Sequence, residues 1–265
     1  MDNIIQLSLW QMAAAFLYIA VLLVIVRLRG IPREKDILFS ALRMTVQLSI
    51  TGFILVQVFK NPSPLLTLII ITVMEAFAVN NAVQRCHVQK APKIIRLIAL
   101  SLVSGTLASI LYFLFVVVQV DPWYDPQYFI PLSGMLIGNS MTGITLGINA
   151  LINGTMDKKD QIEGALMLGA TPKQATRELM DQAFEQAILP TVNSMLGIGI
   201  VFLPGMMTGQ ILSGTSPLTA IRYQIAIMLG ILGSVALSVT LFVHFALGAF
   251  FNKRQQLELP EISKK

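Results

Sequence analysis

The chain has 265 residues, of which 55% are hydrophobic and only 12% are charged, and its formal net charge is +5. Soluble domains carry about 25% charged residues, so the composition excludes an ordinary soluble protein and indicates an integral protein of the lipid bilayer. Basic residues are enriched in the cytoplasmic loops of such proteins, which accounts for the positive charge, so we expect no nucleic-acid partner.

Apolar runs long enough to cross a bilayer recur along the whole chain. A transmembrane helix needs about 20 mostly apolar residues, and segments with turn chemistry, such as "RGIPREKD" and "VDPWYDPQ", separate the runs. The sequence therefore predicts an all-α, polytopic membrane protein with about seven transmembrane helices. We expect these helices at residues 4–26, 37–59, 65–84, 97–118, 129–152, 188–212 and 218–248.

Basic side chains are concentrated in every second segment between these spans. The segments after the first, third and fifth spans hold four each, and the tail holds another four, which makes 16 of the 19 Lys and Arg residues. Because cytoplasmic loops are enriched in Lys and Arg, we expect a protein of the cell membrane with its N-terminus outside and its C-terminus in the cytoplasm. Residues 1–252 are predicted to form one transmembrane domain, and residues 253–265 a cytoplasmic tail.

Glu75 is the clearest ionisable residue inside a predicted span. Charged side chains at membrane depth are unfavourable and usually face a cavity or a partner. Two interpretations stay open: Glu75 lines a path for a cation, or it pairs with a basic residue of another span, such as Arg43.

The fifth predicted span combines small residues with an amide. Gly134 and Gly138 form one pair at a spacing of four, and Gly143 and Gly147 form another. This spacing is typical of closely packed membrane helices. Asn139 lies beside Gly138, and a buried amide needs hydrogen-bond partners.

The longest connection between spans, at about 153–187, is hydrophilic and has the pattern of a helix-turn-helix. Gly169 is placed to end the first helix at about residue 168 in a left-handed conformation. Thr171 and Gln174 then form a capping box, with Pro172 at the first helical position. The second helix carries an apolar stripe at helical spacing, formed by Ala175, Leu179, Ala183 and Ala187.

Two interpretations of this connection stay open. An amphipathic helix can rest on the membrane surface with its apolar stripe in the lipid. Alternatively, two short capped helices at a fixed angle form a compact element that docks on a cytoplasmic partner, and small residues let such a partner approach closely.

The sixth predicted span is irregular. Pro190 and Pro204 interrupt it, and Met206 and Met207 follow the second proline. Irregular backbone at membrane depth is tolerated only where protein or a water-filled cavity covers it, so we expect this span to line a pathway. The thioethers have two interpretations, because methionine is a soft ligand that suits Cu(I) and is also a common filler of apolar cores.

These observations predict a central cavity, formed between two copies of the chain, for a cation that is held weakly. The predicted lining residues are Glu75, Asn139, Met206 and Met207. Histidine and cysteine are scarce, with His87, His244 and the single Cys86, so we assign no metal-ligand set.

Several motifs resemble those of ABC-transporter permeases. "EGALMLGATPKQA" resembles the EAA loop by which these permeases contact their ATPase subunit, with Gly164 in place of the middle alanine. The stretches "LRMTVQL", "PLSGMLIGNSM", "LPTVNS", "LPGMMTGQI" and "IRYQI" are similar to the FetB-type family of ABC permeases associated with iron export. Plant proteins linked to aluminium tolerance are related to that family.

The resemblance implies a permease subunit that exports iron or another metal, driven by a separate ATPase subunit that holds the ATP and Mg²⁺. It also implies a homodimer of this permease. The chain itself has no GxxxxGK[ST] phosphate loop, so we predict a transport subunit without a cofactor of its own and not an enzyme. The residues that the resemblance assigns to coupling are Glu163, Gly164, Ala165, Gly169, Ala170, Thr171 and Pro172.

A stand-alone secondary transporter or channel is the alternative. The hydrophilic connection would then be a surface helix. Such proteins show repeated sets of spans and several charges within the membrane.

Overall fold

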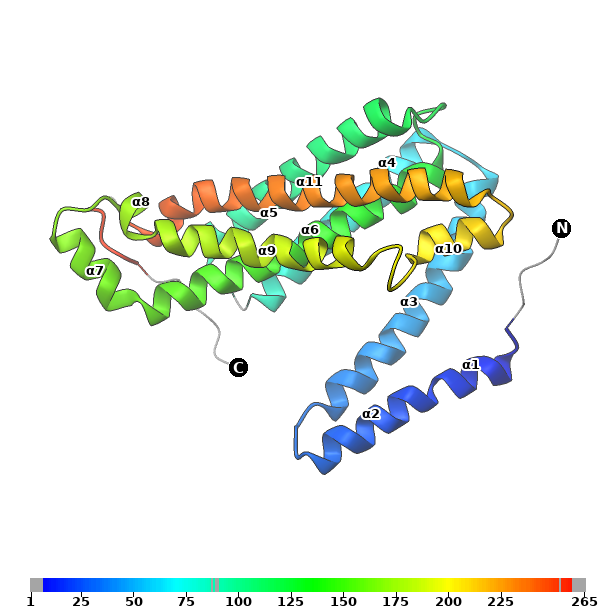
Figure 1. Ribbon diagram of the computed structural model, residues 1–265, viewed down its shortest axis with the longest axis horizontal. Coiled ribbons are helices and arrows are strands. Elements are labelled where there is room, and N and C mark those ends of the chain that lie inside the picture. The colour runs from blue at the N-terminus through cyan, green and yellow to red at the C-terminus, as the bar shows by residue number, and fades with distance from the viewer. Residues whose placement is uncertain (1–6, 87, 89–90, 253, 259–265) are drawn as a thin grey trace. The chain divides into compact units, whose positions relative to one another are not determined.

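The computed structural model describes residues 7–86, 88, 91–252 and 254–258 (Figure 1). The described backbone is helical apart from turns and two isolated β-bridges. The chain divides into two compact units, which are residues 1–62 with 212–214 and residues 63–211 with 215–265.

Six helices in the described part of the chain are long and apolar enough to cross a membrane. They coincide with six of the predicted spans, which confirms an all-α, polytopic membrane protein. The six are Leu9–Leu28, Glu34–Lys60, Pro64–Arg85, Pro92–Val118, Pro126–Asp157 and Pro217–Ala246.

The first unit contains α1, α2 and α3. Ser8 and Gln11 form a capping box that starts α1, and Arg33 pairs with Asp36 at 2.8 Å in the first turn of α3. Most side chains of these helices are apolar and exposed, which suits contact with lipid tails that are as apolar as leucine. The bounds are Leu9–Ala15 for α1, Leu17–Leu28 for α2 and Glu34–Lys60 for α3.

The second unit is a bundle of long helices. α6 has 32 residues and α11 has 34, so each is about 50 Å long at about 1.5 Å per residue and exceeds the bilayer core of about 30 Å. The long helices are α4 (Pro64–Arg85), α5 (Pro92–Tyr112), α6 (Pro126–Asp157), α9 (Arg177–Gly197) and α11 (Pro217–Phe250). The short helices are the π-helix η1 (Phe113–Val118), α7 (Lys159–Met167), α8 (Pro172–Ala175) and α10 (Gly205–Leu212).

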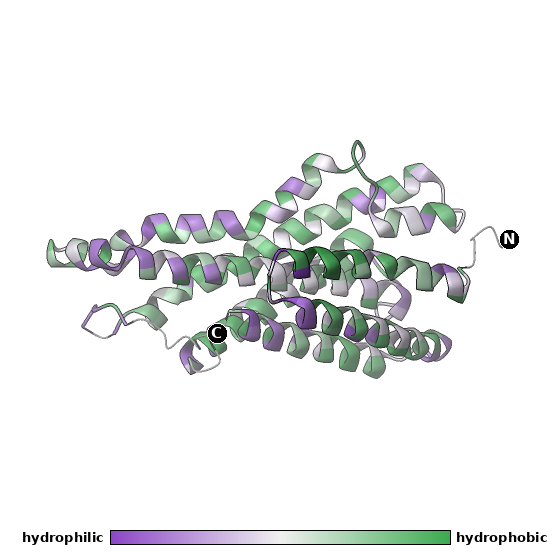
Figure 2. Cartoon of the chain, turned by 90° about the horizontal axis from the view of Figure 1, so that it is seen from below, coloured by the Kyte–Doolittle hydropathy of each residue, from purple (hydrophilic) through white to green (hydrophobic). Residues whose placement is uncertain are grey.

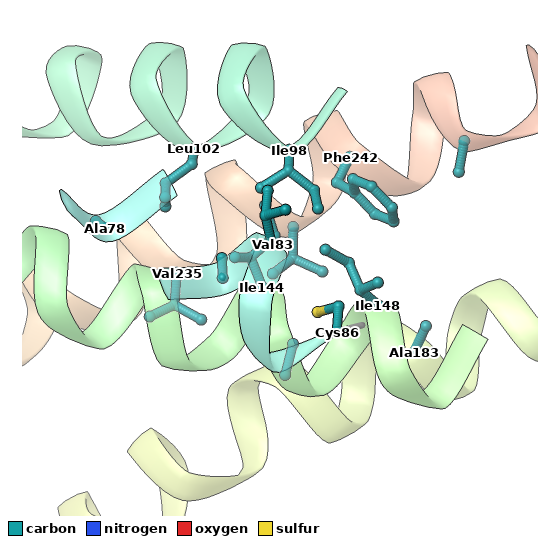
Figure 3. Packing of buried hydrophobic residues seen from close by; sticks show 14 of the residues in the cluster. Ala78, Val83, Cys86, Ile98, Leu102, Ile144, Ile148, Ala183, Val235 and Phe242 are labelled. Carbon is teal, nitrogen blue, oxygen red and sulfur yellow. The ribbon is translucent and has the colours of Figure 1, made fainter. Parts of the chain in front are cut away.

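The core of this bundle lies where α4, α5 and α9 meet α6 and α11. Figure 3 shows how side chains from these helices interdigitate, among them Leu102, Ile144 and Val235, which are completely buried. Ser140 and Ser234 join α6 to α11 by a hydrogen bond of 2.8 Å inside this apolar core. In Figure 2 apolar residues predominate along the long helices, and hydrophilic residues gather toward the end that carries α7 and α8.

Glycines set the distance between α6 and its neighbours. A β-carbon on Gly147 would lie 3.1 Å from the Ala183 carbonyl oxygen of α9, and one on Gly143 would lie 3.1 Å from that of Ala187. The predicted role of this pair in close packing is therefore confirmed. The other pair differs, because Gly134 lies against the Met74 side chain whereas Gly138 has no atom within 4 Å of such a carbon.

The sixth predicted span, 188–212, is split in the structure. Pro190 lies inside α9 without ending it, because a helix packed along its length survives the loss of one hydrogen bond. The chain leaves the helix after Gly197, and residues 198–204 form an irregular loop before α10. Gly199 adopts a φ of +84° in this loop, and Pro204 disfavours helix at the residue before it.

The segment after α11 folds back on the bundle. Phe251 and Leu257 form an isolated antiparallel β-bridge, and the Glu258 N–H donates to the Phe250 carbonyl at 2.8 Å. Lys93 at the start of α5 lies 3.6 Å from the Glu258 carboxylate. Arg254 and Leu257 border a cavity of about 410 Å³ that α7 lines on its other side. The end of α11 therefore lies beside α7, at the hydrophilic end of the bundle.

Candidate functional site

Residues 159–176, which we call the polar helix-turn-helix, contain the residues predicted to couple to an ATPase. α7 ends in a Schellman motif, in which the Ala170 N–H donates to the Ala165 carbonyl and the Gly169 N–H donates to the Leu166 carbonyl, both at 3.0 Å. Gly169 has a φ of +91°, a left-handed conformation that glycine adopts readily. The predicted helix end at this glycine is confirmed.

The second predicted cap is also present. The Gln174 side chain accepts a hydrogen bond of 2.9 Å from the Thr171 N–H, the Thr171 hydroxyl accepts from the Gln174 N–H, and Pro172 starts α8. The second helix is less regular than expected. α8 stops after Ala175, and α9 begins at Arg177 on the far side of Thr176, whose side chain is buried.

The apolar stripe of the second helix packs inside the protein. Leu179, Ala183 and Ala187 are 3%, 0% and 1% exposed. Across from them, α6 presents Gly147 and Gly154, and a β-carbon on Gly154 would lie 2.8 Å from the Leu179 side chain. The stripe is therefore covered by α6 and does not provide the free apolar face that a helix resting on the lipid surface needs.

Further contacts hold the polar helix-turn-helix in place. The Lys158 ammonium lies 3.0 Å from the Glu178 carboxylate, which joins the start of α7 to the start of α9. Ile162 of α7 is 2% exposed and belongs to the bundle core. Glu163 is half-buried and lies 3.8 Å from the ammonium group of Lys159.

The tip of this element exposes two large apolar side chains. Met167 is 87% exposed and Leu168 is 92% exposed. Sequence reasoning passed over both, although two apolar residues directly before a glycine that ends a helix are a usable signal. The structure brings the predicted coupling residues together at this tip, where Glu163, Gly164 and Ala165 lie on α7, Gly169, Ala170 and Thr171 form the turn, and Pro172 begins α8.

A second candidate region lies around the loop 198–204. Asn139 and Met206 border a cavity of about 290 Å³, and Met207 borders a neighbouring cavity of about 430 Å³. Both cavities share three lining residues, which are Ile198, Gln224 and Met228. The amide of Asn139 is exposed and donates a hydrogen bond of 2.8 Å to the Met135 carbonyl, so it is not the fully buried group that the sequence suggested.

Glu75 lies apart from these cavities. Its side chain is 5% exposed, and its Oε1 accepts a hydrogen bond from the Thr106 hydroxyl of α5. Its Oε2 is buried without a hydrogen-bond partner among the described residues. Within one chain, Glu75 is thus separate from the two cavities that Asn139, Met206 and Met207 border, and the pathway between two copies stays a prediction. The ion pair with Arg43 stays a prediction, since Arg43 belongs to the other unit.

Several residues of the second region could not be selected from the sequence. Gln224 is a 6% exposed amide in α11, and Met135, Met195 and Met228 lie on three different helices. A single polar residue or a single methionine in an apolar span carries little information. The packing of α6, α9 and α11 is what brings them together.

The comparisons with known proteins agree with the resemblance seen in the motifs. The chain is 36% identical over 229 residues to the UPF0014 membrane protein slr1647 of Synechocystis, covering 86% of this chain and 88% of that protein. It is 33% identical over 255 residues to the Probable iron export permease protein FetB of Escherichia coli, covering 96% of both.

A plant relative also matches. The chain is 33% identical over 247 residues to the Protein ALUMINUM SENSITIVE 3 of Arabidopsis thaliana, covering 93% of this chain and 88% of that protein. No solved structure matches. The family described as "Uncharacterised protein family (UPF0014)" matches residues 9–251. This multi-pass membrane protein therefore belongs to the UPF0014 family.

Proposed function

We propose that this chain is the membrane-spanning permease subunit of an ABC transporter that exports a metal ion, iron or another. A separate cytoplasmic ATPase subunit binds ATP and Mg²⁺ and drives transport. The relative from Escherichia coli is a probable iron export permease, which supports the substrate class. The observation that carries the proposal is the polar helix-turn-helix with its two exposed apolar side chains.

The tip has the properties of a docking element. Met167 and Leu168 are far more exposed than the rest of the polar helix-turn-helix, whose inner face is buried on the bundle. Covering large apolar side chains with a partner's surface removes them from water and stabilises the complex, and methionine adapts to the shape of that surface. The Schellman turn shapes the tip, and buried Ile162 with the Lys158–Glu178 pair attaches the base of α7 to the bundle, so motion of an attached ATPase would be passed to α6 and α9.

The loop 198–204 supports a homodimer. Ile200 and Val201 are 90% and 80% exposed in the isolated chain. The cavity that Phe202 and Pro204 of this loop border also reaches Ile231, which lies about 21 Å along α11 from Pro217 at about 1.5 Å per residue, so the loop lies at membrane depth. Irregular backbone at that depth needs cover from protein or from a water-filled cavity. A second copy of the chain around a shared pathway provides it.

Cross-linking to a candidate ATPase subunit tests the proposal. Ala165→Cys and Ala170→Cys, each in a Cys86→Ala background, should cross-link to the ATPase through a short bifunctional maleimide. Glu185→Cys is the matched control, since it is exposed on α9 about 20 Å farther along the same segment. Cysteines at 165 and 170 that label freely while the ATPase is present, or that cross-link no more than the control, would contradict docking and favour a stand-alone transporter.

A further inference from the structure

Five of the 13 methionines gather around the two cavities beside the loop 198–204, which we call the methionine cavities. They come from four helices that are distant in the sequence. Met135 lies on α6, Met195 on α9, Met206 and Met207 on α10, and Met228 on α11. Successive residues of a helix point about 100° apart, which is why neighbouring Met206 and Met207 border different cavities.

These thioethers border open volume. Met135, Met206 and Met228 pack against the bundle core, as Met74 and Met141 do, but only the first three also border a cavity. The methionine cavities hold about 290 and 430 Å³, and Met228 borders both. These methionines therefore combine packing against the core with a place on a cavity wall.

The donors around this space are neutral and mostly soft. The amides of Gln224 and Asn139 accompany the five sulfurs, and no described residue that lines either cavity is ionisable. Thioethers prefer Cu(I)-like ions, whereas divalent hard ions prefer carboxylate or imidazole ligands. The unfavourable free energy of moving an ion out of water rises steeply with its charge, so a neutral site favours a monovalent ion.

We propose that each methionine cavity binds a soft monovalent cation, Cu(I) or its analogue Ag(I), through the thioethers of Met206 and Met228 in one cavity and of Met207 and Met228 in the other. The role of these sites in transport rests on the proposed function, and a soft monovalent metal ion would then be the substrate of the exporter. Binding involves no electron transfer, since sulfur lone pairs replace the water ligands of the ion. Two neighbouring sites of neutral donors also suit release, because conduction requires binding weak enough to let the ion leave.

The test uses Ag⁺, which does not undergo the oxidation that complicates Cu⁺. The full chain is purified in detergent with Cys86→Ala, because a thiol would bind Ag⁺ by itself. Titration calorimetry should show Ag⁺ binding that an excess of Fe²⁺ does not displace. Met206→Leu combined with Met228→Leu should raise the Ag⁺ dissociation constant about tenfold or more. X-ray absorption at the silver edge should show sulfur ligands, and fewer of them in the double variant.

Met141→Leu is the matched control, because Met141 lies half-buried on α6 and borders neither cavity. It should leave Ag⁺ binding unchanged, and leucine keeps the volume of methionine in every variant. Absence of Ag⁺ binding, equal loss in the control, or displacement of Ag⁺ by Fe²⁺ would overturn the inference. Because the chain is tested without an ATPase, failure here leaves the docking result untouched, and failure of cross-linking leaves this result untouched.

Discussion

Glu75 and Thr106 illustrate what a single residue contributes inside this bundle. The Thr106 side chain is completely buried, and its hydroxyl donates to Glu75 Oε1. Glu75 Oε2 has no hydrogen-bond partner among the described residues. Within the described part of the chain, the Thr106 hydroxyl is therefore the hydrogen-bond partner of the Glu75 carboxyl group. Removing a partner from a buried polar group leaves that group unsatisfied, which destabilises a fold by about 1–3 kcal/mol.

Thr106→Val should therefore lower the thermal stability of the purified chain in detergent. The expected loss is about 1–3 kcal/mol, because valine keeps the shape of threonine and removes the donor. Thr72→Val is the control, since the Thr72 hydroxyl bonds only to the Leu68 carbonyl of its own helix, at 2.8 Å, and is exposed. Equal stability of the two variants would show that the contact with Glu75 contributes nothing.

Residue-scale features differed in how far the sequence revealed them. The conformation of Gly169 and the Thr171 cap were predicted, because capping depends on residues three or four positions apart. The partner of Glu75 was not, because Thr106 lies 31 residues away on another helix. A carboxyl group in an apolar span indicates that a polar partner is needed, but it does not indicate which residue that partner is.

At the scale of helices, α5 and α11 cross more closely than the sequence suggested. A β-carbon on Gly105 would lie 2.7 Å from the Ser238 Cα, which is closer than non-bonded carbons approach. The contact was missed because Gly105 has no glycine at a spacing of four, where the chain has Ser101 and Ser109 instead. Pairs such as Gly143 and Gly147 are visible as a pattern, whereas a single contact point is defined only by the helix that crosses it.

Gly105→Ala should force α5 and α11 apart and destabilise the chain by about 1–3 kcal/mol. Gly138→Ala is the control, since Gly138 has no atom within 4 Å of an added β-carbon. Both substitutions gain up to about 1 kcal/mol of helix propensity, so the difference between them isolates the contact. Thermal unfolding in detergent measures it, and a Gly105→Ala variant as stable as the control would refute the crossing.

On the scale of the whole molecule, the split sixth span, residues 188–212, completes the path of the chain through the bundle. α11 ends beside α7 and therefore begins at the opposite end. Residues 177–216 must then lead from the polar helix-turn-helix to that opposite end, although α9 and α10 are separated by an irregular loop. The path thus supports the predicted number of crossings even though one of them is not a continuous apolar helix.

Seven crossings, as predicted, would place the two ends of the chain on opposite faces of the membrane. A tag at residue 1 should be accessible from outside the cell, and a cysteine at Gln255, in a Cys86→Ala background, should label only from the cytoplasm. A cysteine at Thr171 should label from the same face as one at Gln255, because Gln255 and Ala170, the residue before Thr171, line the same cavity beside α7. Labelling of both chain ends from one face would reduce the crossings to an even number.

The position of α11 in the bundle also has a consequence for how the protein is made. α11 is synthesised last among the long helices, yet it covers α5, α6 and α9. The Ser140 hydroxyl can form its hydrogen bond with Ser234 only after 94 further residues have been synthesised. Until then, the groove that receives α11 faces lipid or the insertion machinery. A ribosome that stops before the last helix therefore releases a chain with an open, partly polar groove, which quality-control proteases can recognise as unfinished.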